Sequence, residues 1–252
     1  MNIMMIVLNY QKKYMGMFIF RYVINFLRNI RINRICRKYG ITNYTINPDG
    51  SIDVDNNVSI SYRKLYRLPL KFNKISGWFD CSYNKLTNLD GFPNYVGDWC
   101  DCTHNELTSL EGAPKEIGGN FRCYLNNLTD LKGCPKVING YFDCSNNKLT
   151  SLVGCPNYLD GGFSCGDNNL TSLEGCPSDV GGVFLHSYNP ISPIIDLFDD
   201  IKIYLEYQET YNFLRKDSKI VKHLLDEALR DYNEYYNKNI RLPKSFYRYV
   251  YI

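Results

Sequence analysis

The sequence predicts a mainly β solenoid with 21-residue coils, a parallel β-sheet on its concave face, a helical N-terminal arm and a helical C-terminal cap. The main observation is an asparagine that recurs every 21 residues without an insertion. Its members are Asn84, Asn105, Asn126, Asn147, Asn168 and Asn189. A fixed period of this size is typical of stacked repeats, in which each unit buries its apolar side against its neighbours.

Apolar residues recur in columns that keep step with this asparagine. Phenylalanine, or Cys100 in one coil, precedes it by five residues, cysteine usually precedes it by three, and leucine or isoleucine follows it by two and by five. Within Phe142-Asp143-Cys144 the apolar residues alternate with a polar one, which is the period of a short strand. We therefore expect Phe142 and Cys144 to point into the core. One further apolar column contains Val96, Ile117, Ile138, Leu159 and Val180.

Each coil also contains two predicted turns. Asn147 follows its strand, and its amide both donates and accepts, so it is expected to bond turn backbone that has no ladder partner. Gly154 and Pro156 mark an outer bend, because both residue types break extended regular structure. The same Gly-x-Pro spacing recurs in five coils.

The predicted segments are a basic, helical arm (1–40), a β-hairpin cap (41–57), the repeat solenoid (58–195) and a helical C-terminal cap (196–252). The hairpin is expected because Asn47-Pro48-Asp49-Gly50 is a strong turn sequence. The first coil is degenerate, with Arg63 in the asparagine position. A second cap helix is expected to begin near Ser218 and to bury Ile220 and Val221, and the tyrosine-rich tail is expected to be a strand or extended segment.

Nine of the ten cysteines lie inside the repeats, in columns that are expected to face the core. Parallel strands lie ~4.8 Å apart, wider than the ~3.8 Å between the Cβ atoms of a disulfide. We therefore expect a ladder of reduced thiols and a reducing cytoplasm. Zinc is the alternative at Cys100-x-Cys102-x-His104, but Cys102 is expected to face inward while His104 belongs to a turn. We expect neither a metal nor another cofactor.

The N-terminal arm has a charge unlike that of the rest of the chain. Residues 1–40 hold eight of the 29 basic side chains and none of the 26 acidic ones, which leaves a net charge of about −5 on the remainder. The residues expected to carry its binding are Arg21, Arg28, Arg31, Arg34, Arg37 and Lys38. Anionic membrane, nucleic acid and the acidic surface of the repeats themselves remain alternative partners. The uncharged runs are too short for a spanning helix.

Strand alternation sends a second set of residues outward on the concave face, and we expect these to bind the partner. They are Trp78, Asp80, Trp99, Asp101, Arg122, Tyr141 and Asp143. Trp78 and Trp99 occupy the same position in neighbouring coils, beside Asp80 and Asp101. Large aromatic residues next to charge are typical of interface hot spots. The alternative is that the tryptophans pack beneath the basic arm.

The repeat unit carries a family resemblance. Phe-x-Cys-x-x-Asn-x-Leu resembles the leucine-rich repeat, with Phe and Cys in two of its leucine positions. Leu-Thr-Ser-Leu-x-Gly-Cys-Pro, followed by Gly-Gly-x-Phe-x-Cys, resembles the short-repeat proteins of bacteriophages and large DNA viruses, and more distantly the repeat domains of bacterial secreted effectors. The resemblance covers about residues 41–195. It implies a scaffold that serves many partners.

Catalysis is not expected from this chain. Some secreted effectors with similar repeats carry a cysteine-dependent ubiquitin ligase after them, but no cysteine follows Cys176 here. His104, His186 and His223 have no nucleophile motif beside them. The expected function is a non-catalytic interaction scaffold with a protein partner and no small-molecule substrate, placed in the cytoplasm of a host cell if the protein is viral. The alternative is a structural or peripheral membrane component tethered through the arm.

Overall fold

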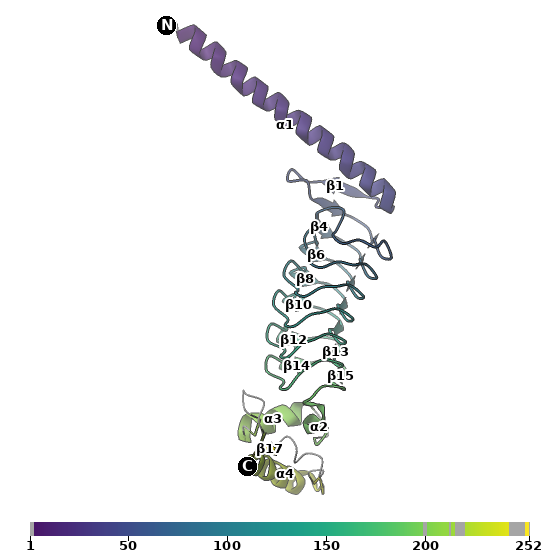
Figure 1. Cartoon of the computed structure of the whole chain (residues 1–252), viewed down its shortest axis with the longest axis vertical. Coiled ribbons are helices and arrows are strands. Elements are labelled where there is room, and N and C mark those ends of the chain that lie inside the picture. Colours follow the sequence, from purple (N-terminus) through teal and green to yellow (C-terminus); the bar gives the residue numbers. More distant parts are fainter. Residues whose placement is uncertain (1–2, 199–200, 212, 215–219, 242–249, 252) are drawn as a thin grey trace.

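The computed structural model describes residues 3–198, 201–211, 213–214, 220–241 and 250–251. A long helix, α1 (Ile3–Tyr39), precedes an antiparallel hairpin of β1 (Tyr44–Ile46) and β2 (Ile52–Val54). A straight stack of similar coils follows, and a group of helices occupies its far end (Figure 1). The structure confirms the predicted β-solenoid, with about six coils spaced by 21 residues and with helices at both ends.

One parallel sheet runs the length of the stack and contains the predicted strands. Its members are β3 (Val58–Ser59), β5 (Phe79–Asp80), β7 (Cys100–Asp101), β9 (Phe121–Arg122), β11 (Phe142–Asp143), β13 (Phe163–Ser164) and β15 (Phe184–Leu185). Phe142 pairs with Phe121 on one side and with Phe163 on the other, so each repeat position lies directly beside its equivalents. We call the outward side of this sheet the strand face.

A second sheet, parallel except for its β1–β2 hairpin, lies across the core from the first and was not predicted. It contains β1, β2, β4 (Phe72–Ile75), β6 (Tyr95–Val96), β8 (Glu116–Ile117) and β10 (Val137–Ile138). The apolar column from Val96 to Val180 falls on this side of the coils. Val96, Ile117, Ile138 and Leu159 are buried, as the inward orientation of that column requires.

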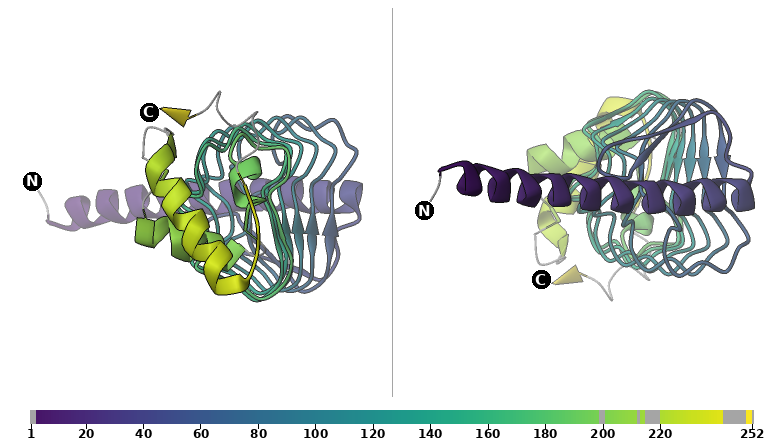
Figure 2. Two further views of the ribbon diagram at one scale, coloured as in Figure 1. Left: turned by 90° about the horizontal axis from the view of Figure 1, so that it is seen from below. Right: turned by 90° about the horizontal axis from the view of Figure 1, so that it is seen from above.

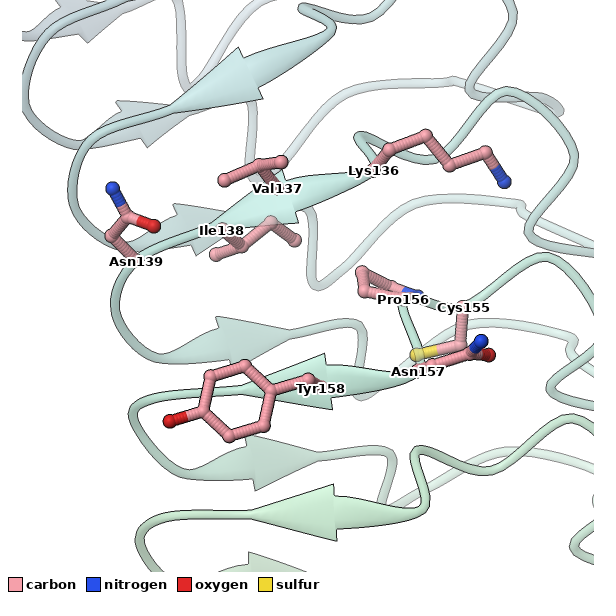
Figure 3. Close-up of a pocket in the computed structure, with 8 residues that line it drawn as sticks. All are labelled: Lys136, Val137, Ile138, Asn139, Cys155, Pro156, Asn157 and Tyr158. Carbon is pink, nitrogen blue, oxygen red and sulfur yellow. The ribbon is translucent and has the colours of Figure 1, made fainter.

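The second sheet is interrupted after β10. The next strands, β12 (Tyr158–Leu159) and β14 (Asp179–Val180), form a separate pair, and a surface hollow of about 330 Å³ lies between the coils of Val137 and Tyr158 (Figure 3). Glycine follows three of the strands on this side, at Gly97, Gly118 and Gly181, and a Cβ at Gly118 would come within 2.2 Å of the Gly97 carbonyl oxygen. Asn139 and Asp160 replace glycine in the two coils on either side of the gap. A side chain at this position lies against the preceding coil, so Asp160 borders the gap, whereas β10, which precedes Asn139, still pairs with β8.

Phenylalanine rings fill the centre of the stack. Phe142 is fully buried, and its ring centroid lies 5.5 Å from those of Phe121 and Phe163 in stacked arrangements. The cysteine ladder lies beside these rings, as predicted.

We expect Phe142→Ala to lower the free energy of unfolding by about 3–5 kcal/mol, because it removes a buried ring and leaves a cavity between two coils. Urea unfolding followed by circular dichroism measures this change. Tyr158→Ala is the matched control, since its side chain is 55% exposed and its loss should cost little. Equal costs for the two variants would contradict the assigned core.

The asparagine column links the coils to one another. The Asn105 side-chain oxygen accepts from the Leu86 backbone N–H at 2.9 Å. Its amide nitrogen donates to the carbonyls of Cys81 and Cys102 at 3.1 Å and of Thr103 at 3.2 Å. The expected bonds to turn backbone are therefore present, and others reach the preceding coil. Each asparagine from Asn84 to Asn168 makes equivalent bonds.

All ten cysteines lie within the described residues and carry free thiols. Nine are buried, and Cys176 is half-buried. The Cys144 thiol donates to the Ser164 carbonyl of the next coil at 3.4 Å, and Cys81 and Cys102 make the equivalent bond. Burial raises the pKa of these thiols well above its usual value, and it raises the pKa of Cys176 to about 12. The thiols are therefore protonated at neutral pH.

Helix α1 crosses the N-terminal end of the stack and projects beyond it (Figure 2). Ile32 and Cys36 are buried in this packing. The Tyr44 hydroxyl donates to the Asn33 side-chain oxygen at 2.8 Å, which fixes the helix against β1. Arg28 lies against the hairpin turn, so closely that a Cβ at Gly50 would come within 2.9 Å of Arg28 Cδ.

The far end of the stack carries α2 (Ser192–Ile195), α3 (Ile201–Tyr211) and α4 (Lys222–Tyr236). Phe198, Tyr204, Phe213 and Tyr232 pack together there through aromatic contacts. The predicted second helix begins later than expected, and Ser218 lies outside the described residues. Ile220 and Val221 form β16 instead, which pairs in parallel with β17 (Val250–Tyr251). Two β-branched residues next to each other favour this extended conformation.

Candidate functional site

The two tryptophans of the protein stack on each other on the strand face. Their ring centroids are 4.7 Å apart and their planes differ by 8°. Each side chain is half-buried, so one side of the pair remains open to solvent. The Trp78 backbone N–H donates to the Asn57 side-chain oxygen at 3.1 Å, and the Trp99 carbonyl accepts from Phe79 N–H at 3.0 Å. The parallel register of β5 and β7 therefore positions the pair.

The aspartates beside the tryptophans hold the turns that follow their strands. The Asp80 side-chain oxygen accepts from the Ser82 N–H at 2.9 Å and from its hydroxyl at 2.6 Å. Asp101 accepts from the Thr103 N–H at 2.9 Å. Asp143 repeats the pattern of Asp80 with Ser145. One carboxylate oxygen of each residue is thus used locally.

The Asp101 carboxylate is largely enclosed, with only 16% of its side chain exposed. Burial raises its pKa, and the neighbouring charge of Asp80 adds to that rise, whereas bonds from Thr103 and the charge of Arg122 lower it. The Arg122 guanidinium lies 3.9 Å from the free Asp101 oxygen. A single arginine therefore faces the aspartate pair, which leaves net negative charge beside the tryptophans.

Tyr141 does not join the tryptophan pair. Its ring lies over Gly162, where a Cβ would come within 2.8 Å of the ring, and its backbone N–H donates to the Asn120 side-chain oxygen at 2.8 Å. Burial raises the pKa of Tyr141. The structure thus places Trp78, Trp99, Asp80, Asp101 and Arg122 in one patch. Asp143 lies in register with Arg122 at the edge of this patch.

The contacts that fix α1 lie on the hairpin, through Ile32, Asn33 and Cys36. Of the arm residues expected to bind a partner, Arg28 is half-buried beside Gly50. The others are exposed: Arg21, Arg31, Arg34, Arg37 and Lys38.

An aromatic column at the strand-to-asparagine turn was missed by the sequence reasoning. Tyr62 stacks on Tyr83 at 4.3 Å, Tyr83 stacks on His104 at 4.1 Å, and Tyr124 meets His104 edge-on. The rings of Tyr62, Tyr83 and His104 line part of a shallow hollow of about 620 Å³. The sequence contains a signal for this column, because an aromatic ring, Tyr83 or His104, directly precedes the repeat asparagine in two successive coils. Tyr83 and His104 adopt left-handed backbone conformations with φ of 53° and 51°, which directs their side chains away from the cysteines.

The fold and the strand face define this chain as a β-solenoid protein with an exposed, acidic and aromatic patch. Comparison of the chain with protein-family models, curated proteins and solved structures found no match. Within the described residues, no group of three or more His, Cys, Asp or Glu side chains could hold a metal ion. Over the same residues, the search for a helix of sufficient length and apolarity to cross a bilayer found none.

Proposed function

We propose that this protein is a non-catalytic repeat scaffold that binds a basic segment of another protein through Trp78, Trp99, Asp80, Asp101 and Arg122. The observation that carries the proposal is the parallel stack of two half-exposed tryptophans beside the acidic pair. The stack presents a large, rigid apolar surface whose side chains are already ordered. A partner can therefore bury it without the entropic cost of fixing these rings.

The charges on the patch favour a basic partner. Asp80 and Asp101 lie directly opposite each other on neighbouring strands, where like charges destabilise the pair. Arg122 offsets only part of this repulsion, because its guanidinium is 3.9 Å from Asp101. A lysine or arginine side chain of a partner, placed near the carboxylates of Asp80 and Asp101, would offset the remaining repulsion between them. Such complementarity also selects against acidic proteins.

Two further observations support a scaffold. The repeat resembles leucine-rich repeats, which present continuous strand faces to partners. Burial keeps the thiols of the described coils protonated, so they are poor nucleophiles at neutral pH. A reducing, cytoplasmic environment of a host cell belongs to the same proposal.

Selection of random peptides displayed on phage tests this function. We expect the wild-type protein to enrich peptides rich in lysine and arginine, with binding that weakens as salt rises. Trp78→Ala combined with Trp99→Ala should weaken the selected peptides by roughly 30-fold or more, because loss of a hot spot costs about 2 kcal/mol or more. The thermal midpoint of the folded protein is measured in parallel.

The matched control is Tyr66→Ala combined with Tyr235→Ala, which removes two exposed aromatic side chains outside the patch. This variant should bind the selected peptides as the wild type does. Enrichment of neutral or acidic peptides would overturn the choice of a basic partner. Equal binding by the tryptophan variant, with its fold intact, would place the interface elsewhere.

A further inference from the structure

The side of α1 that faces away from the stack presents an apolar segment followed by a basic one. Ile32 and Cys36 are buried on the side that packs against the hairpin. At roughly 100° per residue, Ile30 and Arg34 lie on the opposite side of the helix from them. The outward stripe, with spacings of three and four residues, contains Val23, Leu27, Ile30, Arg34 and Lys38.

The apolar half of the outward stripe has no cover among the described residues. Leu27 is 58% exposed and Ile30 is 49% exposed, and Tyr22 and Phe26 flank them with more than half of each side chain exposed. Soluble surfaces usually scatter such residues singly. Here four such residues gather between Tyr22 and Ile30 on α1. A partner surface that accepts apolar side chains would fit them.

The basic half of the stripe limits what that surface can be. Arg31, Arg34, Arg37 and Lys38 are all exposed, and α1 contains no acidic residue. A second copy of this helix would bring like charges together. Nucleic acid would satisfy the arginines but not the aliphatic side chains. An anionic bilayer satisfies both, because the apolar residues enter the acyl boundary while the cations remain among the headgroups.

We propose that α1 binds anionic membrane surfaces in the plane of the interface, through the outward stripe and the neighbouring Arg31 and Arg37. The helix lies across the end of the stack, so this contact would leave the strand face free. The membrane-binding surface of α1 is thus separate from the patch that contains Trp78 and Trp99.

Co-sedimentation of the full-length protein with vesicles tests the proposal. We expect binding to vesicles of phosphatidylcholine mixed with phosphatidylserine, and much weaker binding to phosphatidylcholine alone. Arg31→Gln, Arg34→Gln and Lys38→Gln together should weaken partitioning by roughly 100-fold, since each cation near an anionic surface contributes about a factor of five. Lys115→Gln, Lys136→Gln and Lys148→Gln remove the same charge from exposed positions on the coils, and should change partitioning little.

A second variant separates membrane insertion from simple charge attraction. Val23→Ser, Leu27→Ser and Ile30→Ser keep every charge, and we expect them to reduce vesicle binding at least 10-fold, because they remove the inserted apolar area. Unchanged vesicle binding by this variant would overturn the proposal in favour of a purely electrostatic ligand, which duplex RNA and DNA would then be used to identify. Failure of the wild type to bind anionic vesicles, with a dimer in solution, would assign the stripe to a second copy of the chain.

Discussion

Raising the pH is expected to unfold this protein cooperatively between about pH 9 and pH 10. Nine thiols of the coils have pKa values raised by burial, to about 12 for Cys176 and further for the most buried. In the unfolded chain a thiol titrates near pH 8.5. Stability from these groups is therefore complete below pH 8.5 and falls as pH rises toward the folded pKa values.

The expected loss is large because the thiols act together. Each one removes about 1.4 kcal/mol per pH unit once the unfolded thiol is ionised, so nine remove about 10 kcal/mol between pH 8 and pH 9.5. A typical domain has about 5–15 kcal/mol in total. The 22 tyrosines begin to titrate only toward the upper end of this window, because their ordinary pKa is about 10, so the thiols titrate first and set the alkaline limit of the fold.

Circular dichroism and the ultraviolet absorbance of thiolates, recorded together in a reducing buffer against pH, measure this transition. Both signals should change at the same pH. Cys134→Ala combined with Cys155→Ala removes two of the titrating groups and should make the transition less steep. Thiolates that form near pH 8.5 while the dichroism is unchanged would contradict the burial of the ladder.

Asn168→Ala is expected to lower the free energy of unfolding by about 3–6 kcal/mol. The side-chain oxygen of Asn168 accepts from the Leu149 N–H at 2.9 Å, and its amide nitrogen donates to the carbonyls of Cys144, Cys165 and Gly166 at 3.0–3.1 Å. Alanine can replace none of these bonds. The Leu149 N–H is left without a partner, which costs about 1–3 kcal/mol, and the three carbonyls, which keep other donors, each lose a bond worth about 0.5–1.5 kcal/mol.

The adjacent residue supplies the control. Asn169 is exposed, and its backbone N–H keeps its own bond to Leu149 O whatever the side chain. Asn169→Ala should therefore cost less than about 0.5 kcal/mol in urea unfolding. Asn168→Asp should destabilise at least as much as Asn168→Ala, because it turns a carboxylate oxygen toward three carbonyls. Similar costs at positions 168 and 169 would show that the asparagine column is not what joins the coils.

The solenoid could be predicted because each coil has the same residue types at the same positions. The phenylalanine, cysteine, leucine and asparagine columns each have one role, and that role is the same in coil after coil. The second sheet was missed because its strands β6, β8 and β10 each show a single buried apolar residue, as in Val137–Ile138, so no alternation is visible. Its interruption between β10 and β12 has no counterpart in the residue pattern, because Asn139 also lacks glycine and yet follows a strand that still pairs with β8.

The strand face was predicted in part. Alternation places Trp78 and Trp99 outward in one column, and parallel register is sufficient to stack them. The bonds from Ser82 and Thr103 to the aspartates depend on turn geometry that a residue pattern does not specify. The Tyr141 ring lies over Gly162 because glycine has no side chain there. This contact can be foreseen only when the two neighbouring coils are aligned position by position. β16 was misassigned because Ile220-Val221 also fits the spacing of a helix.

Between β10 and β12 the coils of the stack are paired in one sheet only. On the strand face β11 and β13 remain hydrogen-bonded, whereas on the opposite side the two coils are held apart. Bending of the stack toward the strand face would separate β10 from β12 without breaking a backbone hydrogen bond between them, because these two strands are not paired. Flexure at this point would change the angle between the N-terminal coils, which carry the tryptophans, and the C-terminal helices. At this junction the two parts of the stack are joined by the strand face and the Asn168 side chain, and not by the second sheet.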